Sequence, residues 1–170
     1  NHQNYHDIAV VKSHTTYEGK TNTTAIHPTG LGTLLKNEYS NYFKNVILIR
    51  GRLEHRALAQ EDKNFMQPGY FMQSEGAEML SLQMLQGNMN GLREKNSIFL
   101  SGSLAAKFFP EQDALDKVIT MDGQHDLKVT GIYEDLPQNS TFHEASFFAP
   151  LNLYLQGWSS LNVWDNYNMY

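Results

Sequence analysis

The apolar residues of this chain occur in short runs separated by turn-forming residues, and this spacing is the strongest limit on its fold. The densest runs are Val46–Ile49 and Phe147–Leu151. Runs of this length suit buried strands and fall far short of the ~20 apolar residues of a membrane span. The 170 residues include no cysteine, which excludes a disulfide scaffold and a thiolate metal site. The chain must therefore fold around a hydrophobic core assembled from short strands and helices.

The residue patterns predict strands and helices that mix without a strict βαβα alternation, which is typical of the α+β class. Asp122-Gly123 is a turn pair for a hairpin, and Gly131 indicates a bulge or the close approach of another backbone. A loop is expected over 14–24 and another over 135–142. Strands are expected over 5–13, 44–51, 53–60, 65–72, 97–100, 118–121, 127–133 and 164–170. Helices are expected from Pro28 to about Asn41, over 76–85, and up to Phe109 with Ser101 or Ser103 as the cap.

Charge and histidine spacing weigh against two classes of ligand. There are 13 Lys and Arg and 18 Asp and Glu, a formal charge of −5, and no basic run, so nucleic acid is not an expected partner. The seven histidines form no HxxxH or HExxH pattern, and no metal site is predicted.

No cofactor or catalytic residue is predicted. Thr29–Gly32 resembles half of a dinucleotide loop, but Leu35 stands where the third glycine would be, so a helix entry is the better interpretation. Ser101–Ser103 does not match the hydrolase elbow G-x-S-x-G. Glu134 and Asp135 are adjacent in an extended segment, where neighbouring side chains point to opposite faces. We expect no enzymatic activity in this chain.

Three motifs follow one another between residues 97 and 142. They are LSGSLAAKFF over Leu100–Phe109, DALDKVI over Asp113–Ile119, and VTGIYEDLPQNS over Val129–Ser140. Their order resembles the extracytoplasmic core domain of MacB/FtsX-like ABC transporter permeases, especially the Bacteroidetes type. The positions that carry this signature, all expected to be structural, are Leu100, Ser101, Phe108, Phe109, Lys117, Gly131, Asp135, Pro137, Asn139 and Ser140.

The resemblance implies an architecture and a place in the cell. It implies a mixed βαβ, porter-like base formed by residues 1–73 plus 158–170, with the C-terminal part of the base missing. It also implies an inserted, sabre-like α+β subdomain over 74–157. Such domains lie between the first and second membrane helices, so this part of an inner membrane protein is expected on the periplasmic side.

The resemblance also implies a function without catalysis. ATP hydrolysis is expected on a separate nucleotide-binding subunit or domain, and the domain couples it mechanically to export or extraction of a substrate. The expected partners are a second permease half in a dimer, a periplasmic adaptor, and a lipoprotein, peptide or drug cargo. The alternative is an extracellular ligand-binding sensor domain of a membrane receptor, which a defined apolar pocket with convergent polar groups would favour.

Overall fold

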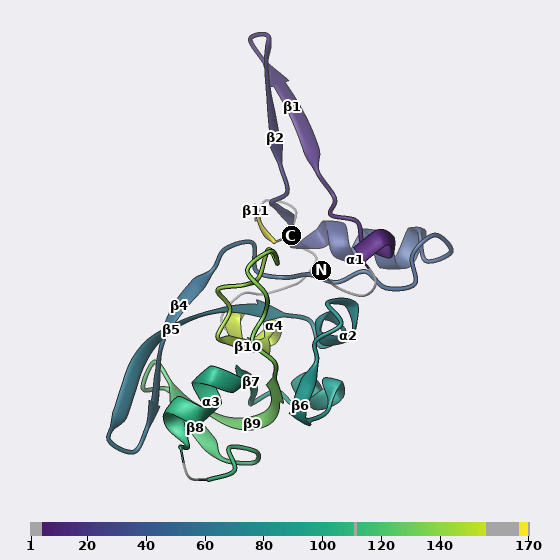
Figure 1. Ribbon diagram of the computed structural model, residues 1–170. Coiled ribbons are helices and arrows are strands. Elements are labelled where there is room, and N and C mark those ends of the chain that lie inside the picture. Colours follow the sequence, from purple (N-terminus) through teal and green to yellow (C-terminus); the bar gives the residue numbers. More distant parts are fainter. Residues whose placement is uncertain (1–4, 111, 156–166, 170) are drawn as a thin grey trace.

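Seven strands form one mixed sheet that makes up the body of the protein (Figure 1). The structure is a computed structural model, and it describes residues 5–110, 112–155 and 167–169. The order of the strands in the sheet is β6-β9-β7-β10-β5-β4-β8. Their bounds are β4 Glu54–Gln60, β5 Lys63–Met72, β6 Met84–Gly87, β7 Ser97–Ser101, β8 Val118–Met121, β9 His125–Tyr133 and β10 Phe147–Pro150.

An additional pairing closes six of these strands into a ring. β8 pairs with β4 on one side and with β9 on the other, so β9-β7-β10-β5-β4-β8 returns to β9. β9 is long enough to share one edge between two neighbours: residues 125–128 pair with β8, and residues 131–133 pair with β6. β7 occupies its other edge in parallel register. Closure leaves few free strand edges in the body of the protein.

Alternate residues of the ring strands contribute to two core clusters on opposite faces of the sheet. Ile98 and Leu100 belong to one cluster, and Phe99 between them belongs to the other. The first cluster also receives α3 (Gly102–Phe108) and α4 (Leu151–Tyr154), while the second receives α2 (Gly76–Met79) and the 3₁₀ helix η2 (Met89–Arg93). The ring is therefore packed on both sides with apolar side chains.

The N-terminal residues form a hairpin that projects from this body (Figure 1). Its strands are β1 (Ser13–Tyr17) and β2 (Lys20–Thr24), joined by a two-residue turn in which Glu18 and Gly19 have φ of 48° and 74°. Positive φ at both turn residues is the type I′ geometry that matches the twist of a hairpin. A short 3₁₀ helix, η1 (Tyr5–Asp7), precedes the hairpin.

After the hairpin, β3 (His27–Pro28) pairs antiparallel with β11 (Tyr167–Met169) and leads into α1 (Thr29–Glu38). Pro28, which the sequence places in the first turn of this helix, is its N-cap, one position before the first helical residue. A Cβ on Gly32 would lie 2.8 Å from the Leu48 side chain, so α1 approaches the 46–50 segment closely. The Gln73 side-chain carbonyl accepts hydrogen bonds from Leu48 N at 3.1 Å and from Lys36 Nζ at 3.0 Å, which joins α1 to the end of β5.

Two predictions at the N-terminus are wrong. The strand expected over 5–13 is η1 followed by irregular chain, and Val10 and Val11 are 57% and 45% exposed. The loop expected over 14–24 is the β1–β2 hairpin. Its threonines are β-branched residues that favour strands, and Gly19 supplies the turn, so local propensity outweighed polarity.

Two further predictions are wrong in the middle of the chain. Residues 44–51 form no strand and make isolated bridges only, among them one from Ile49 to Met72, although Leu48 and Ile49 are buried as expected. The helix expected over 76–85 ends after one turn, because Ser81 adopts a φ of 51° and the chain then pairs with β9 as β6. Of the strand expected over 164–170, the structure describes β11 alone.

The fold class is α+β, as predicted. β5 pairs with β10 and β4 pairs with β8, so the sheet continues across the expected boundary between residues 73 and 74. The division into 1–73 plus 158–170 and 74–157 stays a prediction. No helix among the described residues has the length and apolar character needed to cross a membrane.

Candidate functional site

Several of the signature residues meet where β9 ends and α3 begins. Ser101 is the N-cap of α3, and its Oγ accepts a hydrogen bond from Leu104 N at 3.2 Å. Ser103 instead donates twice to Asp135: its backbone N lies 3.2 Å and its Oγ 2.6 Å from Asp135 Oδ2. Of the two serines that could cap the helix, Ser101 is therefore the cap, and Ser103 binds the helix start to the segment after β9.

Gly131 lies at a β-bulge in β9. Ile98 pairs with Val129 and Phe99 pairs with Gly131, so β9 has one extra residue at this point. A Cβ on Gly131 would lie 2.5 Å from Met84 Cε and 2.7 Å from Phe99 Cε1. Both features expected from the sequence, the bulge and the close approach of a neighbour, are present at the place where β9 exchanges β8 for β6.

The loop after β9 is fixed by hydrogen bonds of its own. Tyr133 is fully buried, and its hydroxyl donates to the Ala145 carbonyl at 2.8 Å. Burial raises the pKa of Tyr133 well above its usual value of 10.0, and the nearby charge of Asp135 adds to this rise. Ser140 is also buried; its N donates to the Pro137 carbonyl at 2.8 Å, and its Oγ accepts from Phe142 N at 3.2 Å.

The other signature positions lie in two kinds of environment. Leu100, Phe108 and Phe109 are buried in the core cluster that contains α3. Lys117, Pro137 and Asn139 are exposed. The structure thus brings Ser101, Gly131 and Asp135 to one junction and leaves Lys117 outside it.

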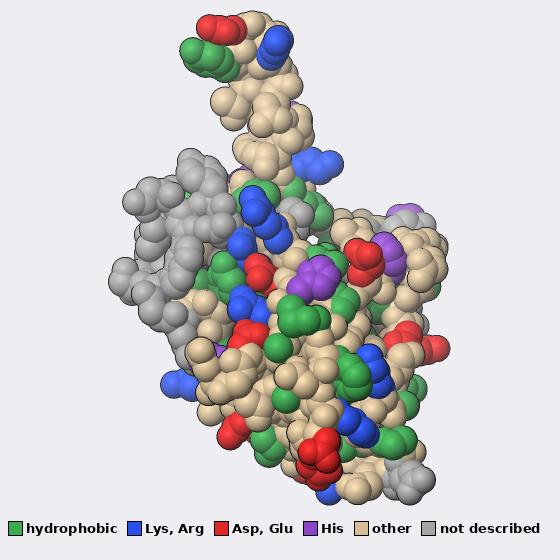
Figure 2. Space-filling view, turned by 90° about the vertical axis from the view of Figure 1, so that its left-hand side faces the viewer, with side chains coloured by type: hydrophobic (Ala, Val, Ile, Leu, Met, Phe, Trp, Pro, Cys, Tyr) green, Lys and Arg blue, Asp and Glu red, His purple; other side chains and the backbone are tan. Residues whose placement is uncertain are grey.

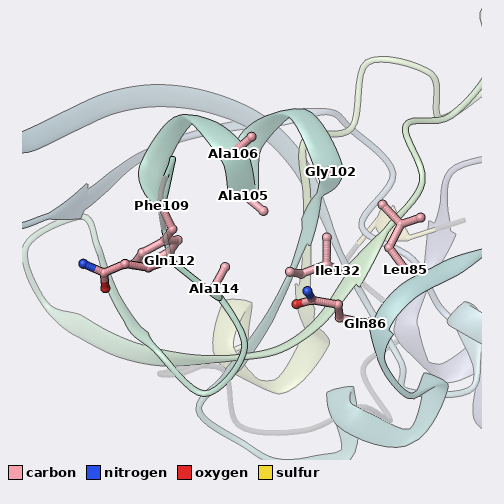
Figure 3. A pocket seen from close by; sticks show the side chains of 9 residues that line it. All are labelled: Leu85, Gln86, Gly102, Ala105, Ala106, Phe109, Gln112, Ala114 and Ile132. Carbon is pink, nitrogen blue, oxygen red and sulfur yellow. The ribbon is translucent and has the colours of Figure 1, made fainter.

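A cavity of about 270 Å³ lies beside this junction (Figure 3). Its walls are α3 and the edge strand β6, and Ile132 of β9 lies between them. Its polar groups are the side-chain amides of Gln86 and Gln112. The lining residues are Leu85, Gln86, Gly102, Ala105, Ala106, Phe109, Gln112, Ala114 and Ile132. The lining contains no charged side chain and no nucleophile, so it offers no acid or base.

The junction has little capacity for chemistry. The Ser101 hydroxyl serves as a helix cap, and the Ser103 hydroxyl donates to a carboxylate rather than to a base that could activate it. Within 5–110, 112–155 and 167–169, no group of three or more His, Cys, Asp or Glu side chains could hold a metal ion.

Sequence reasoning missed an ionic network on another side of the ring. Arg50 is 8% exposed and donates to Glu54 at 3.0 Å, and the other oxygen of Glu54 accepts from Arg56 at 3.2 Å. Arg56 also pairs with Asp122 at 3.1 Å, in the β8–β9 turn. The sequence spacing of residues 50, 54 and 56 indicates these ion pairs only weakly. Asp122 comes near Arg56 through the pairing of β4 with β8, which joins residues far apart in the sequence. On the face shown in Figure 2, Lys and Arg side chains alternate with Asp and Glu without a region of one sign.

The fold and the junction together define an α+β domain in which Ser101 caps α3 and Gly131 lies at the bulge of β9. The sequence profile of the MacB-like periplasmic core domain matches residues 2–168. The chain therefore belongs to the MacB-like periplasmic core domain family, and the resemblance inferred from residues 97–142 is confirmed. No curated protein matches the chain.

Three solved structures share the fold. A domain described as part of a permease protein from Porphyromonas gingivalis is 18% identical with a TM-score of 0.76, covering 99% of this chain and 73% of that one. The periplasmic region of MacB from Actinobacillus actinomycetemcomitans is 15% identical with a TM-score of 0.59, covering 79% and 59%. The extracellular domain of the noncanonic ABC-type transporter YknZ from Gram-positive bacteria is 14% identical with a TM-score of 0.51, covering 66% and 58%. The chain thus spans less than two thirds of the last two.

Proposed function

We propose that this chain is the extracytoplasmic domain of an ABC transporter permease, and that it transmits movement of the membrane part to a substrate or an adaptor. ATP is hydrolysed on a separate nucleotide-binding subunit or domain, and this chain performs no reaction. Membership of the MacB-like family and the likeness to transporter domains support the assignment.

The closed ring is the observation that supports mechanical transmission. A domain that passes a displacement from one end to the other must move as a rigid body, because soft parts would absorb the movement. Each ring strand here is paired on both sides, and apolar clusters pack against both faces. Separating one strand from such a ring therefore costs a free energy close to that of global unfolding.

The pairing of β3 with β11 connects two segments that lie far apart in the sequence. Residues 27–28 and 167–169 lie side by side although about 140 positions separate them. A long-range pairing of this kind helps the domain to move as one body when the membrane part moves.

The position of the domain is tested with Glu61→Cys in the full-length protein, after any cysteine outside residues 1–170 is replaced by serine. Glu61 lies exposed in the β4–β5 turn, and residues 1–170 contain no cysteine. We expect a membrane-impermeant maleimide to label this variant while the inner membrane is intact. Labelling that requires lysis of the inner membrane would contradict the proposal.

Transmission is tested by replacing residues 29–166 with a short Gly-Ser linker, since the β3–β11 pairing brings the two cut ends together. With its nucleotide-binding partner in vesicles, the shortened protein should keep ATP hydrolysis and lose transport. Transport that continues at the rate of the full protein would refute transmission through this domain. The labelled Glu61→Cys protein is the control, because it changes a turn and leaves the ring intact.

The sensor alternative depends on a ligand pocket. Pockets for small ligands occupy roughly 300–1,000 Å³. The cavity beside α3 has about 270 Å³, and none of the side chains that line it is charged, so this cavity favours the transporter proposal over the sensor.

A further inference from the structure

Three aromatic side chains are exposed immediately after α1. Tyr39, Tyr42 and Phe43 are 47%, 80% and 41% exposed. Tyr42 N donates a hydrogen bond to the Tyr39 carbonyl at 2.9 Å, and the centroids of the two tyrosine rings lie 6.4 Å apart. Residues 39–44 therefore form a turn with its rings on the surface, and we call them the aromatic turn. It follows the end of α1 that points away from the base of the hairpin (Figure 1).

A cavity of about 220 Å³ adjoins the aromatic turn and carries charges of both signs. Lys36 and Lys44 supply two ammonium groups to its lining, Glu75 supplies a carboxylate, and Phe43 of the turn forms part of the wall. The cavity thus offers two cations and one anion beside an exposed aromatic surface.

The contacts of these charged groups hold them in place without fully compensating them. Lys36 Nζ donates to the neutral amide oxygen of Gln73 at 3.0 Å, which does not neutralise its charge. Lys44 Nζ lies 3.7 Å from Glu78, and both side chains are largely exposed, so this ion pair is weak. A ligand in the cavity can therefore still gain from both ammonium groups.

The pattern matches a ligand that carries a phosphate and, close to it, an ammonium group. Lysine binds phosphate as a point charge, and a carboxylate accepts hydrogen bonds from an ammonium group. The phosphoethanolamine headgroup of a phospholipid has both groups. Tyrosine, with an apolar ring and a polar tip, is enriched at membrane–water interfaces, where one end of the side chain meets lipid and the other meets water.

We propose that the aromatic turn and its cavity bind the membrane surface at amine-bearing zwitterionic phospholipids. The phosphate lies against Lys36 and Lys44, the headgroup amine lies against Glu75, and the rings of Tyr42 and Phe43 lie among the headgroups. The inference rests on the proposed function, because a membrane is within reach only if the domain belongs to a membrane permease. It goes further by assigning the surface that meets the bilayer and the headgroup that this surface selects.

The composition of the surface favours a bilayer over the other occupants. Protein interfaces are depleted of lysine, which lines this cavity twice. Tyrosine next to lysine is instead typical of segments at a membrane surface, where the ring and the lysine stem contact apolar atoms and the polar ends stay in water. A free small molecule in the cavity would leave the Tyr42 ring in water.

Lipid contact is measured with a bimane probe on Asn41→Cys in the full-length protein, with any cysteine outside residues 1–170 replaced by serine. Asn41 is exposed within the turn, so all three rings are kept. In vesicles of phosphatidylcholine and phosphatidylethanolamine that contain a lipid spin-labelled at its headgroup, we expect this probe to be quenched. The matched control is a probe on Glu61→Cys in the exposed β4–β5 turn, at the far side of the body (Figure 1), which should be quenched several-fold less.

Exchange of the phosphatidylethanolamine identifies the headgroup. Quenching should fall in phosphatidylcholine alone, whose amine has no N–H to donate to Glu75, and with phosphatidylglycerol, which has no amine. Glu75→Gln should keep the quenching seen in phosphatidylcholine and lose the increase that phosphatidylethanolamine causes, whereas a misfolded variant would lose both. Glu78→Gln is the matched control, because Glu78 is exposed and lies outside the lining, and it should keep the increase.

The contribution of the rings is tested separately. In the Asn41→Cys background, Tyr42→Ala should lower quenching in all three membranes. Tyr17→Ala is the control for this change, because Tyr17 is 75% exposed on the hairpin, and it should leave quenching unchanged.

Three results would overturn the proposal. Equal quenching of the Asn41 and Glu61 probes would exclude contact between the turn and the bilayer. An increase with phosphatidylethanolamine that persists in Glu75→Gln would exclude the assigned headgroup. An Asn41 probe shielded from aqueous iodide but not quenched by the lipid would assign the surface to a protein. Maleimide labelling of Glu61→Cys separates this inference from the proposed function: labelling with the inner membrane intact, together with an unquenched Asn41 probe, refutes the inference alone.

Discussion

Replacing Gly131 with alanine should destabilise the protein by about 1–2 kcal/mol. The new Cβ would lie 2.5 Å from Met84 Cε and 2.7 Å from Phe99 Cε1. The methionine end can rotate away, but the Phe99 ring is fully buried in the second core cluster and must shift with its neighbours. Overpacking of this kind costs about 1–3 kcal/mol, and the loss of backbone freedom in the unfolded chain offsets about 0.4–1 kcal/mol of it.

Urea unfolding measures this cost. With a slope of roughly 2 kcal/mol per molar urea, the midpoint should fall by roughly 0.5–1 M while the slope stays unchanged. Gly102→Ala is the matched control, since the tightest contact of its Cβ would be with the end of the exposed Leu85 side chain, at 3.1 Å. Its effect should stay within about 0.5 kcal/mol. Equal midpoints for the two variants would refute the reasoning.

A double-mutant cycle tests whether the ring is the cause. Phe99→Leu removes the Cε1 atom and leaves a shorter side chain at the same position. If the clash with the ring sets the cost, Gly131→Ala should cost less in the Phe99→Leu background than in the original protein. Additive costs would show that the backbone of the bulge, rather than the ring, resists the alanine.

Three further predictions concern individual hydrogen bonds and ion pairs of β9 and α3. Ser101→Ala removes the cap on Leu104 N and should cost about 1 kcal/mol, lowering the calorimetric Tm by roughly 2–4 °C; an unchanged Tm would contradict the cap. Tyr133→Phe leaves the buried Ala145 carbonyl unpaired and should cost about 1–3 kcal/mol at neutral pH. Because its pKa is raised in the folded state, Tyr133 contributes stability below pH 10.0 that is lost as pH rises toward the folded pKa, so urea midpoints of the original protein should fall more steeply above pH 10.0 than those of Tyr133→Phe. Lys128→Gln removes exposed ion pairs that raise the pKa of Lys128, and it should change the urea midpoint less than Ser101→Ala does. In 1 M salt the urea midpoints of Lys128→Gln and the original protein should be equal, because salt screens exposed charges.

The elements that could be predicted from the sequence carry their signals locally. Asp122 and Gly123 have φ of 54° and 66°, the geometry of the turn that an Asp-Gly pair favours, and they join β8 to β9 as expected. Pro28 begins α1, and Ser101 and Pro110 bound α3. In each case a residue with a restricted backbone or a capping side chain determines the conformation within a few positions.

The elements that could not be predicted depend on partners far along the chain. Residues 46–49 are apolar, which fits a buried strand. They are buried instead against α1 and the end of β5, and this burial does not require a strand. The stripe of Met79, Leu80 and Leu82 fits a helix, yet β9 offers a pairing edge to the residues that follow. The same holds for the site. The signature motifs are contiguous and were found, whereas the network around Arg50 joins segments that only the closed ring brings together.

The closed ring and the hairpin differ in the backbone edges that they leave open. Ser101, Gly131 and Asp135 lie at the junction of the ring with α3, where they fix the start of the helix and the course of β9. A ring whose strands are all paired offers few backbone groups to another protein, so a partner must bind its side chains or bind elsewhere. The hairpin is the element that combines free backbone edges with distance from the body. Ser101, Gly131 and Asp135 therefore fix the body of the domain, whereas no other described strand pairs with the outer edges of the hairpin.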